Sequence, residues 1–128
     1  MDGMKVLVVD DEVHIVNVVA VKLRNNDYEV IMAENGQEAF ELACEELPDI
    51  IVTDFQMPIM TGLELVEKLR QTEATKDIPV IMLTARDFSI EDGKKEELNI
   101  SDCIVKPFSP RELLKSIENV LHDSSAVE

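Results

Sequence analysis

The sequence predicts an α/β domain built on a doubly wound, five-stranded parallel sheet with helices on both faces. Short apolar, β-branched runs alternate with segments of helical periodicity five times along 128 residues. The composition is that of a globular chain, because 45% of the residues are hydrophobic and only four Gly and five Pro interrupt them. Polar residues follow four of the apolar runs, and the carboxyl ends of parallel strands would bring them to one rim.

The chain opens with a strand, a helix and a second strand. MKVLVV, at residues 4–9, is an apolar and β-branched run. Asp11 is expected to N-cap a helix over residues 12–26, in which apolar residues recur along one side. A short second strand is expected at residues 28–33.

Turn residues place the next three elements. Asn35-Gly36 precedes a second helix that ends before Pro48, because the residue before a proline disfavours helical backbone. The third strand is expected at residues 49–53, and a third helix at residues 63–69.

The C-terminal part completes the alternation. A fourth strand is expected at residues 79–83, a weaker helix at 90–98 and a fifth strand at 103–105. Ser109-Pro110 is a favourable start for the last helix, with Ser at the N-cap and Pro at the first helical position.

This length and pattern predict one domain, residues 1–122, followed by a flexible tail at residues 123–128. Cys44 and Cys103 have no metal-ligand or CxxC spacing and fit a reducing compartment. The N-terminus lacks the apolar core of a signal peptide, and no apolar stretch approaches membrane-spanning length. The protein is therefore expected to be cytoplasmic.

The net charge of the chain limits which kinds of partner it can bind. Lys and Arg number 12 and Asp and Glu number 27, so the net charge is 12 − 27 = −15. Such a charge repels phosphate backbones and anionic lipid, which argues against direct binding to nucleic acid or membranes. A metal cation or a cationic partner fits better.

The predicted rim gathers carboxylates, a hydroxyl and an amine. Asp10 and Asp11 follow the first strand and Asp54 the third, while Thr84 and Lys106 follow the fourth and fifth. Clustered carboxylates suit a partly hydrated Mg²⁺. A carboxylate attacks phosphorus only when the charge of the incoming phosphoryl group is neutralised. Each residue alone has a more ordinary interpretation, such as a helix cap or a solvated lysine, but none of these explains the common position.

Five motifs give the chain a resemblance to a known family. VLVVDDE, NGQEA, IIVTDFQMPIMTGLEL, PVIMLTAR and VKPFSPRELL occur in this order over nearly the whole chain. Together they resemble the receiver domain of two-component response regulators, of the stand-alone, single-domain type. The resemblance implies a flavodoxin-like sheet with strand order 2-1-3-4-5.

The resemblance also implies a function and a set of site residues. A sensor histidine kinase or a histidine phosphotransfer protein would donate a phosphoryl group, in the presence of Mg²⁺, and a downstream protein target would bind the altered surface. The chain would catalyse only its own phosphorylation and dephosphorylation. The implied roles are Asp54 as phosphoacceptor, Thr84 and Lys106 as partners of the phosphoryl group, and Asp10, Asp11, Asp54 and the Gln56 backbone carbonyl around the metal.

Two positions depart from the family pattern. Cys103 stands where an aromatic residue usually rotates on activation, and Asn99-Ile100 stands where Gly-Ala is common. We therefore expect signalling through a weaker or differently routed shift of the helix after the fourth strand, or mainly through docking near Asp54. The resemblance further implies that Gln56 and Arg86 set the lifetime of the phosphoryl group, and that the kinase contacts Ile15, Val18, Pro107 and Phe108.

Other functions stay open at this point. A small aspartyl-phosphate phosphatase of the haloacid dehalogenase type would require Asp-x-Asp after the first strand, where this chain has Asp10-Asp11-Glu12. A flavodoxin-like electron carrier would need a Ser/Thr/Gly-rich loop there and aromatic residues to stack on a flavin. A phosphorylation-independent pseudo-receiver is disfavoured because every phosphorylation residue is present. The chain could equally be a fragment of a longer transcription factor.

Overall fold

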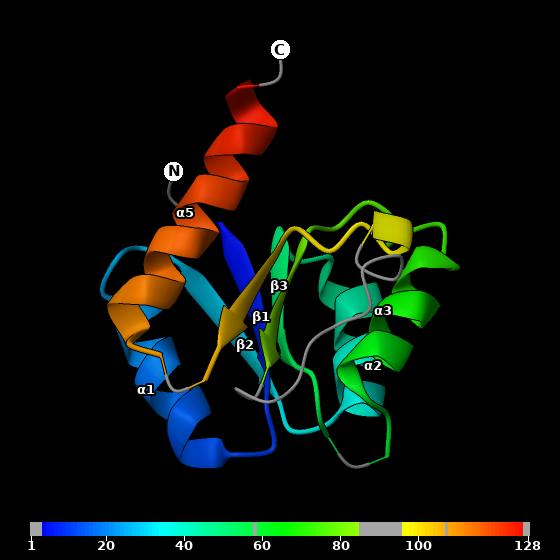
Figure 1. The fold of residues 1–128 in the computed structure, drawn as a ribbon, viewed down its shortest axis with the longest axis horizontal. Helices are drawn as coiled ribbons and strands as arrows, with labels where there is room; N and C mark the ends of the chain where they lie inside the picture. Colours follow the sequence, from blue (N-terminus) through cyan, green and yellow to red (C-terminus); the bar gives the residue numbers. More distant parts are fainter. Residues whose placement is uncertain (1–3, 58, 85–95, 107, 127–128) are drawn as a thin grey trace.

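The computed structural model describes residues 4–57, 59–84, 96–106 and 108–126, and it arranges them in three layers (Figure 1). A parallel sheet in the order β2-β1-β3-β4-β5 forms the middle layer, which confirms the predicted fold class and strand order. The strands are β1 (Lys5–Val9), β2 (Glu29–Ala33), β3 (Ile50–Asp54), β4 (Val80–Thr84) and β5 (Asp102–Val105). The helices are α1 (Val13–Arg24), α2 (Gly36–Glu46), α3 (Gly62–Arg70) and α5 (Pro110–Ala126).

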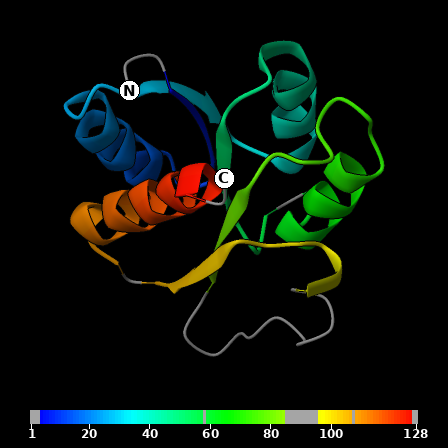
Figure 2. The ribbon, with the colours of Figure 1, turned by 90° about the horizontal axis from the view of Figure 1, so that it is seen from above.

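The helices cover both faces of the sheet, α1 with α5 on one side and α2 with α3 on the other (Figure 2). Residues of β1 alternate between the two faces: Leu7 and Val9 belong to the core under α2 and α3, and Val6 and Val8 to the core under α1 and α5. Burial on both faces explains why these strands read as continuous apolar runs. In the described part of the chain, no helix combines the length and the apolar character needed to cross a bilayer.

The start of α1 corrects one prediction. The helix begins at Val13, with Glu12 in the capping position and no side-chain cap bond, so Asp11 is not the N-cap. Instead, Oδ1 of Asp10 accepts a hydrogen bond from the Glu12 amide at 3.0 Å. The carboxylate that comes first in the sequence therefore holds the turn, which leaves the Asp11 side chain exposed at the rim.

The last helix begins as predicted and continues further than expected. Ser109 Oγ accepts from the Glu112 amide at 3.1 Å, and Pro110 is the first helical residue. The backbone stays helical to Ala126, past residue 122, where the domain was predicted to end, because no Gly or Pro interrupts the segment. The helix predicted at residues 90–98 falls largely on residues 85–95, which lie outside the described residues.

Arg70, at the end of α3, ties three segments together. Its guanidinium donates to the carbonyl of Leu98 at 2.8 Å and to that of Asn99 at 3.3 Å. It also donates to the carbonyls of Lys76 and Ile78, at 2.9 and 2.8 Å, just before β4. The planar fork of arginine suits this divergent set of acceptors. The connections into β4 and β5 are thereby fixed to the far end of α3.

Candidate functional site

The carboxyl ends of four neighbouring strands bring the predicted polar residues to one rim. β1 and β3 pair in parallel register, so Asp10 and Asp54 lie at the same level on adjacent strands. Thr84, the last residue of β4, pairs with Val105 of β5, and Lys106 follows directly. Asp10 is 0% exposed, Asp54 7% and Thr84 3%. Such burial is unusual for carboxylates and requires compensation from neighbouring groups.

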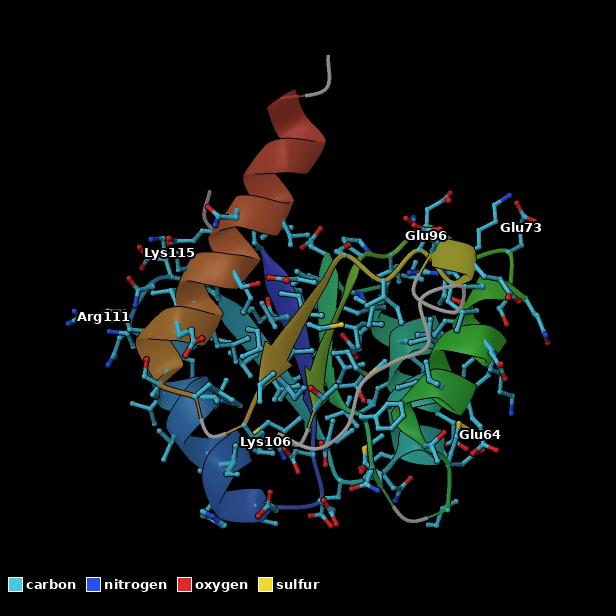
Figure 3. The ribbon with its side chains drawn as sticks, in the orientation of Figure 1. Glu64, Glu73, Glu96, Lys106, Arg111 and Lys115 are labelled. Carbon is cyan, nitrogen blue, oxygen red and sulfur yellow. The ribbon has the colours of Figure 1, made fainter. Side chains whose placement is uncertain are left out.

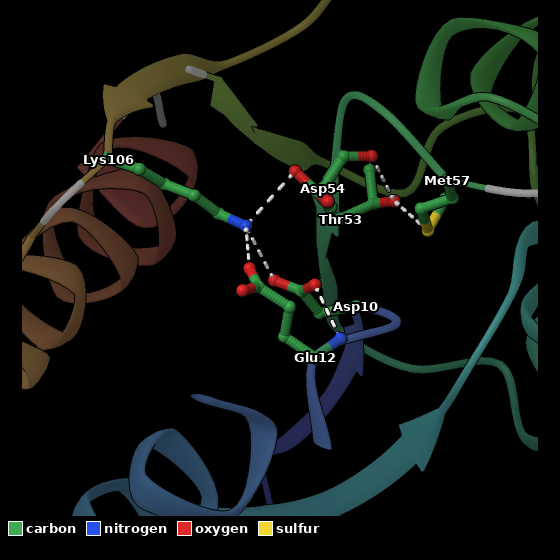
Figure 4. Close-up of polar contacts among 6 residues, drawn as sticks. All are labelled: Asp10, Glu12, Thr53, Asp54, Met57 and Lys106. Atoms are coloured by element: carbon green, nitrogen blue, oxygen red, sulfur yellow. Dashed lines mark hydrogen bonds and ion pairs between the residues drawn. The ribbon is translucent and has the colours of Figure 1, made fainter. Parts of the chain in front are cut away.

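The ammonium group of Lys106 contacts three carboxylates at once (Figure 4). Its Nζ lies 3.0 Å from Asp10 Oδ2, 3.1 Å from Glu12 Oε1 and 3.3 Å from Asp54 Oδ1. It donates hydrogen bonds to the Asp10 and Glu12 oxygens. Reasoning from the sequence did not find Glu12, whose only signal is its position directly after the acidic pair.

Burial and like charge work against ionisation of the carboxylates. Burial, together with the charge of Asp10, raises the pKa of Asp54 from its usual 3.8 to about 6, despite the opposing charge of Lys106. Burial also raises the pKa of Asp10, although hydrogen bonds from Glu12 and Lys106 oppose the rise. For Lys106, burial favours the neutral amine, but Asp10, Asp54 and Glu12 outweigh it and raise the pKa. Lys106 therefore stays protonated, but its single positive charge does not neutralise the three carboxylates around it.

The excess negative charge at this rim would favour the binding of a metal cation. Carboxylate oxygens of Asp10, Asp11 and Asp54 all lie within 4.8 Å of one another. Hard divalent cations such as Mg²⁺ and Ca²⁺ take oxygen ligands of this kind, and the exposed Asp11 leaves one side open to water. The donor set therefore fits a small, partly hydrated divalent cation.

The loop after β3 is anchored so that the Asp54 backbone has little freedom. The Phe55 amide donates to the Leu83 carbonyl at 2.8 Å, which extends the pairing of β3 with β4 by one residue. The Gly62 amide closes the loop on the Phe55 carbonyl at 2.9 Å. A Cβ added at Gly62 would overlap the carbonyl oxygen of Asp54 and lie 2.8 Å from Sδ of Met82. Only glycine fits where α3 starts against the phosphoacceptor candidate.

The predicted flanking residues differ in how far they are exposed. Gln56, two residues after Asp54, has an exposed side chain. On α1, Val18 is exposed and Ile15 half-buried. Phe108 packs against the core shared by α1 and α5. Outside the described residues lie Arg86 and Pro107.

The structure describes the surroundings of Cys103 and Asn99, two residues expected to depart from the family pattern. Cys103 pairs with Met82 in the sheet and is half-buried against the core under α2 and α3. Asn99 has φ of 56°, in the left-handed region that favours glycine and that asparagine tolerates best among other residues. Asparagine is therefore compatible with the backbone that this position adopts.

Comparisons with known proteins agree on one family. The sequence profile of the response regulator receiver domain matches residues 6–118. The chain is 43% identical over 123 residues to the phosphate regulon transcriptional regulatory protein PhoB of Pseudomonas aeruginosa, covering 94% of this chain and 53% of that protein. It is 40% identical over 120 residues to the alkaline phosphatase synthesis transcriptional regulatory protein PhoP of Bacillus subtilis, covering 94% and 49%. The chain thus spans about half the length of these curated relatives.

A solved structure shows the same architecture. The fold is similar to that of the chemotaxis response regulator CheY4 of Vibrio cholerae, with a TM-score of 0.82 and 37% sequence identity. The similarity covers 91% of this chain and 97% of that one.

Proposed function

The chain belongs to the response regulator receiver domain family, and from that premise we propose that it is a phosphorylation-dependent signalling switch with Asp54 as phosphoacceptor. One observation carries the proposal. The buried Asp54 carboxylate lies 3.3 Å from the Lys106 ammonium and beside the carboxylates of Asp10 and Asp11, so a nucleophile, a fixed cation and a metal-binding cluster share one rim.

The proposed reaction is transfer of a phosphoryl group to the Asp54 carboxylate. An Oδ atom attacks phosphorus, the bond from phosphorus to the donor's imidazole nitrogen breaks, and its electron pair stays on that nitrogen. The product is an acyl phosphate on Asp54. Lys106 pairs with one phosphoryl oxygen, and the Thr84 hydroxyl donates to another.

A magnesium ion is the proposed cofactor. When bound, Mg²⁺ would supply positive charge that neutralises the phosphoryl oxygens and the carboxylates. Asp10, Asp11, Asp54 and the backbone carbonyl of Gln56 would hold it, with Asp10 acting through water. The all-carboxylate cluster within 4.8 Å supports this donor set.

The proposed partners are proteins in the cytoplasm. A sensor histidine kinase or a histidine phosphotransfer protein donates the phosphoryl group, contacting the rim and α1 around Ile15 and Val18, and a downstream protein reads the altered surface. The net charge of −15 argues against direct binding of nucleic acid or membranes by this chain. The proposed switch unit is residues 1–122, and it catalyses no reaction beyond its own phosphorylation and dephosphorylation.

Intact-mass spectrometry tests this function. The wild type and Asp54→Asn are incubated with acetyl phosphate, with and without Mg²⁺. The expected result is a Mg²⁺-dependent gain of one phosphoryl group by the wild type only. A gain by the variant would move the phosphoacceptor elsewhere, and failure of the wild type both to gain mass and to bind beryllofluoride would refute the switch.

A further inference from the structure

Lys106 has as many carboxylate partners as it has N–H donors. An ammonium group carries three N–H bonds and accepts none. Three carboxylate oxygens, from Asp10, Glu12 and Asp54, lie 3.0, 3.1 and 3.3 Å from Nζ. The contacts with Asp10 and Glu12 are hydrogen bonds, and the contact with Asp54 is an ion pair. A phosphoryl group on Asp54 adds acceptor oxygens that compete for the N–H donors of Lys106. A full set of hydrogen bonds to these oxygens therefore comes at the expense of a carboxylate that the ammonium group now contacts.

The three carboxylates differ in how easily they are released. The Asp10 side chain has no exposed surface and also holds the Glu12 amide, so its release would leave a buried charge unpaired. The Asp54 side chain is 10% exposed and itself carries the phosphoryl group. The Glu12 side chain is 48% exposed, so its carboxylate returns to water when it leaves Lys106. Release of Glu12 costs the least.

Glu12 also stands apart from the metal-binding oxygens. The carboxylate oxygens that converge within 4.8 Å come from Asp10, Asp11 and Asp54. Within the described part of the chain, that cluster does not include Glu12. Its side chain acts on the lysine and leaves the cation cluster unchanged.

We propose that Glu12 is the exchangeable partner of Lys106: it holds one N–H donor of the ammonium group in the resting protein and yields that donor to the phosphoryl oxygen. Glu12 is thus a positioning residue that acts through Lys106. It keeps the lysine aimed at the rim and at the same time competes with the phosphorylated state. This inference rests on the proposed function of Asp54 as phosphoacceptor.

Three variants test the exchange. Glu12→Gln keeps the shape of the side chain but offers a neutral, weaker acceptor. Glu12→Asp keeps the charge but shortens the side chain by one methylene, so the contact with Lys106 is lost. Glu73→Gln is the matched control, because Glu73 pairs with Lys76 at 3.1 Å in the same way, far from the rim (Figure 3). Each is titrated with beryllofluoride in excess Mg²⁺, and separately with Mg²⁺ alone.

Glu12→Gln and Glu12→Asp are both expected to bind beryllofluoride about two- to fivefold more tightly than the wild type, the range that a half-exposed ion pair carries. Affinity for Mg²⁺ alone should stay unchanged, and Glu73→Gln should match the wild type in both titrations. Unchanged or weaker beryllofluoride binding by Glu12→Gln overturns the proposal. Beryllofluoride binding by Glu12→Asp equal to that of the wild type also overturns the proposal. In that case a negative charge at position 12 would weaken binding even without contact to Lys106. Absence of binding by the wild type refutes the switch itself, and this inference with it.

Discussion

Asp10 and Lys106, 96 residues apart in the sequence, form an ion pair of 3.0 Å in which the carboxylate has no exposed surface. The pair joins the first and last strands of the chain across the rim. Asp54 therefore contacts an ammonium group that is already paired with Asp10. The metal-free rim therefore holds more negative charge than its own residues neutralise, and the first prediction follows from this.

The stability of the metal-free protein should fall as pH rises from about 4 to about 7. The folded-state pKa of Asp54 is raised to about 6 from 3.8, so the fold favours its neutral form. The stabilisation from that form is fully present below pH 3.8 and is lost as pH rises through about 6. The loss at pH 7 is on the order of 2–3 kcal/mol.

The check is chemical denaturation in EDTA across this pH range, for the wild type and Asp54→Asn. The variant carries a neutral side chain at every pH, so it should be more stable than the wild type at pH 7 and similar to it at pH 4. Equal pH dependence of the two proteins would contradict the predicted shift.

Replacing Gly62 should disturb both stability and the rim. In Gly62→Ala the added Cβ overlaps the Asp54 carbonyl oxygen, so the phosphoacceptor backbone must move. We expect a loss of about 2 kcal/mol or more in unfolding free energy, together with weaker beryllofluoride binding. Thermal and denaturant unfolding, with the same titration, measure the two effects.

Gly36→Ala is the matched control for that change. Its Cβ would lie 2.8 Å from Cβ of Met60 and 2.9 Å from the Met60 carbonyl oxygen, so the clash falls in the loop between β3 and α3 and not on Asp54 itself. Stability should fall, but beryllofluoride affinity in the folded protein should hold. Loss of affinity in both variants would mean that general loosening of the fold, rather than displacement of Asp54, is responsible.

Arg70 should matter for stability through its fork of donors as well as its charge. Arg70→Met leaves the carbonyls of Leu98, Lys76 and Ile78 without this partner and should cost about 2–4 kcal/mol. Arg70→Lys keeps the charge but cannot reach all the acceptors, so the loss should be smaller. Denaturant unfolding measures both, with the exposed Arg24→Met expected to stay within about 0.5 kcal/mol of the wild type. A loss in Arg24→Met equal to that in Arg70→Met would contradict the role of the fork.

Because residue 103 is a cysteine, the structural response to phosphorylation should stay close to Asp54. Cys103 is half-buried beside Met82 and is too small to fill or vacate an aromatic-sized pocket by changing rotamer. Amide chemical shifts with and without beryllofluoride should change strongly around Asp54 and little across α5. Large shifts across α5 in the wild type would contradict this routing, and Cys103→Tyr should extend the shifts toward α5.

The convergence of Asp10, Asp54, Thr84 and Lys106 at one rim was predictable, because parallel strands with clear apolar runs place their carboxyl ends together. The start of α5 at Pro110 was predictable from local capping chemistry. These features depend on local sequence patterns and on the rule that parallel strands end at the same edge of the sheet.

Other features depend on contacts that no local pattern encodes. The cap of α1 was misassigned because neighbouring Asp10 and Asp11 are chemically equivalent, and only tertiary structure decides which one reaches the Glu12 amide. The contact between Glu12 and Lys106 spans 94 residues. The four carbonyls that converge on Arg70 belong to separate loops, and backbone acceptors carry no signature in the sequence.

The direction of α5 determines how this protein can be handled in assays. The helix begins four residues after Lys106 and runs about 25 Å over its 17 residues, away from the rim and past the far end of the sheet (Figure 1). β1 starts from that same far side. A fluorophore or a surface linker attached near the start of β1 or the last turn of α5 would therefore lie on the side of the sheet away from Asp54, so an immobilised sample would present its rim freely to a kinase in solution.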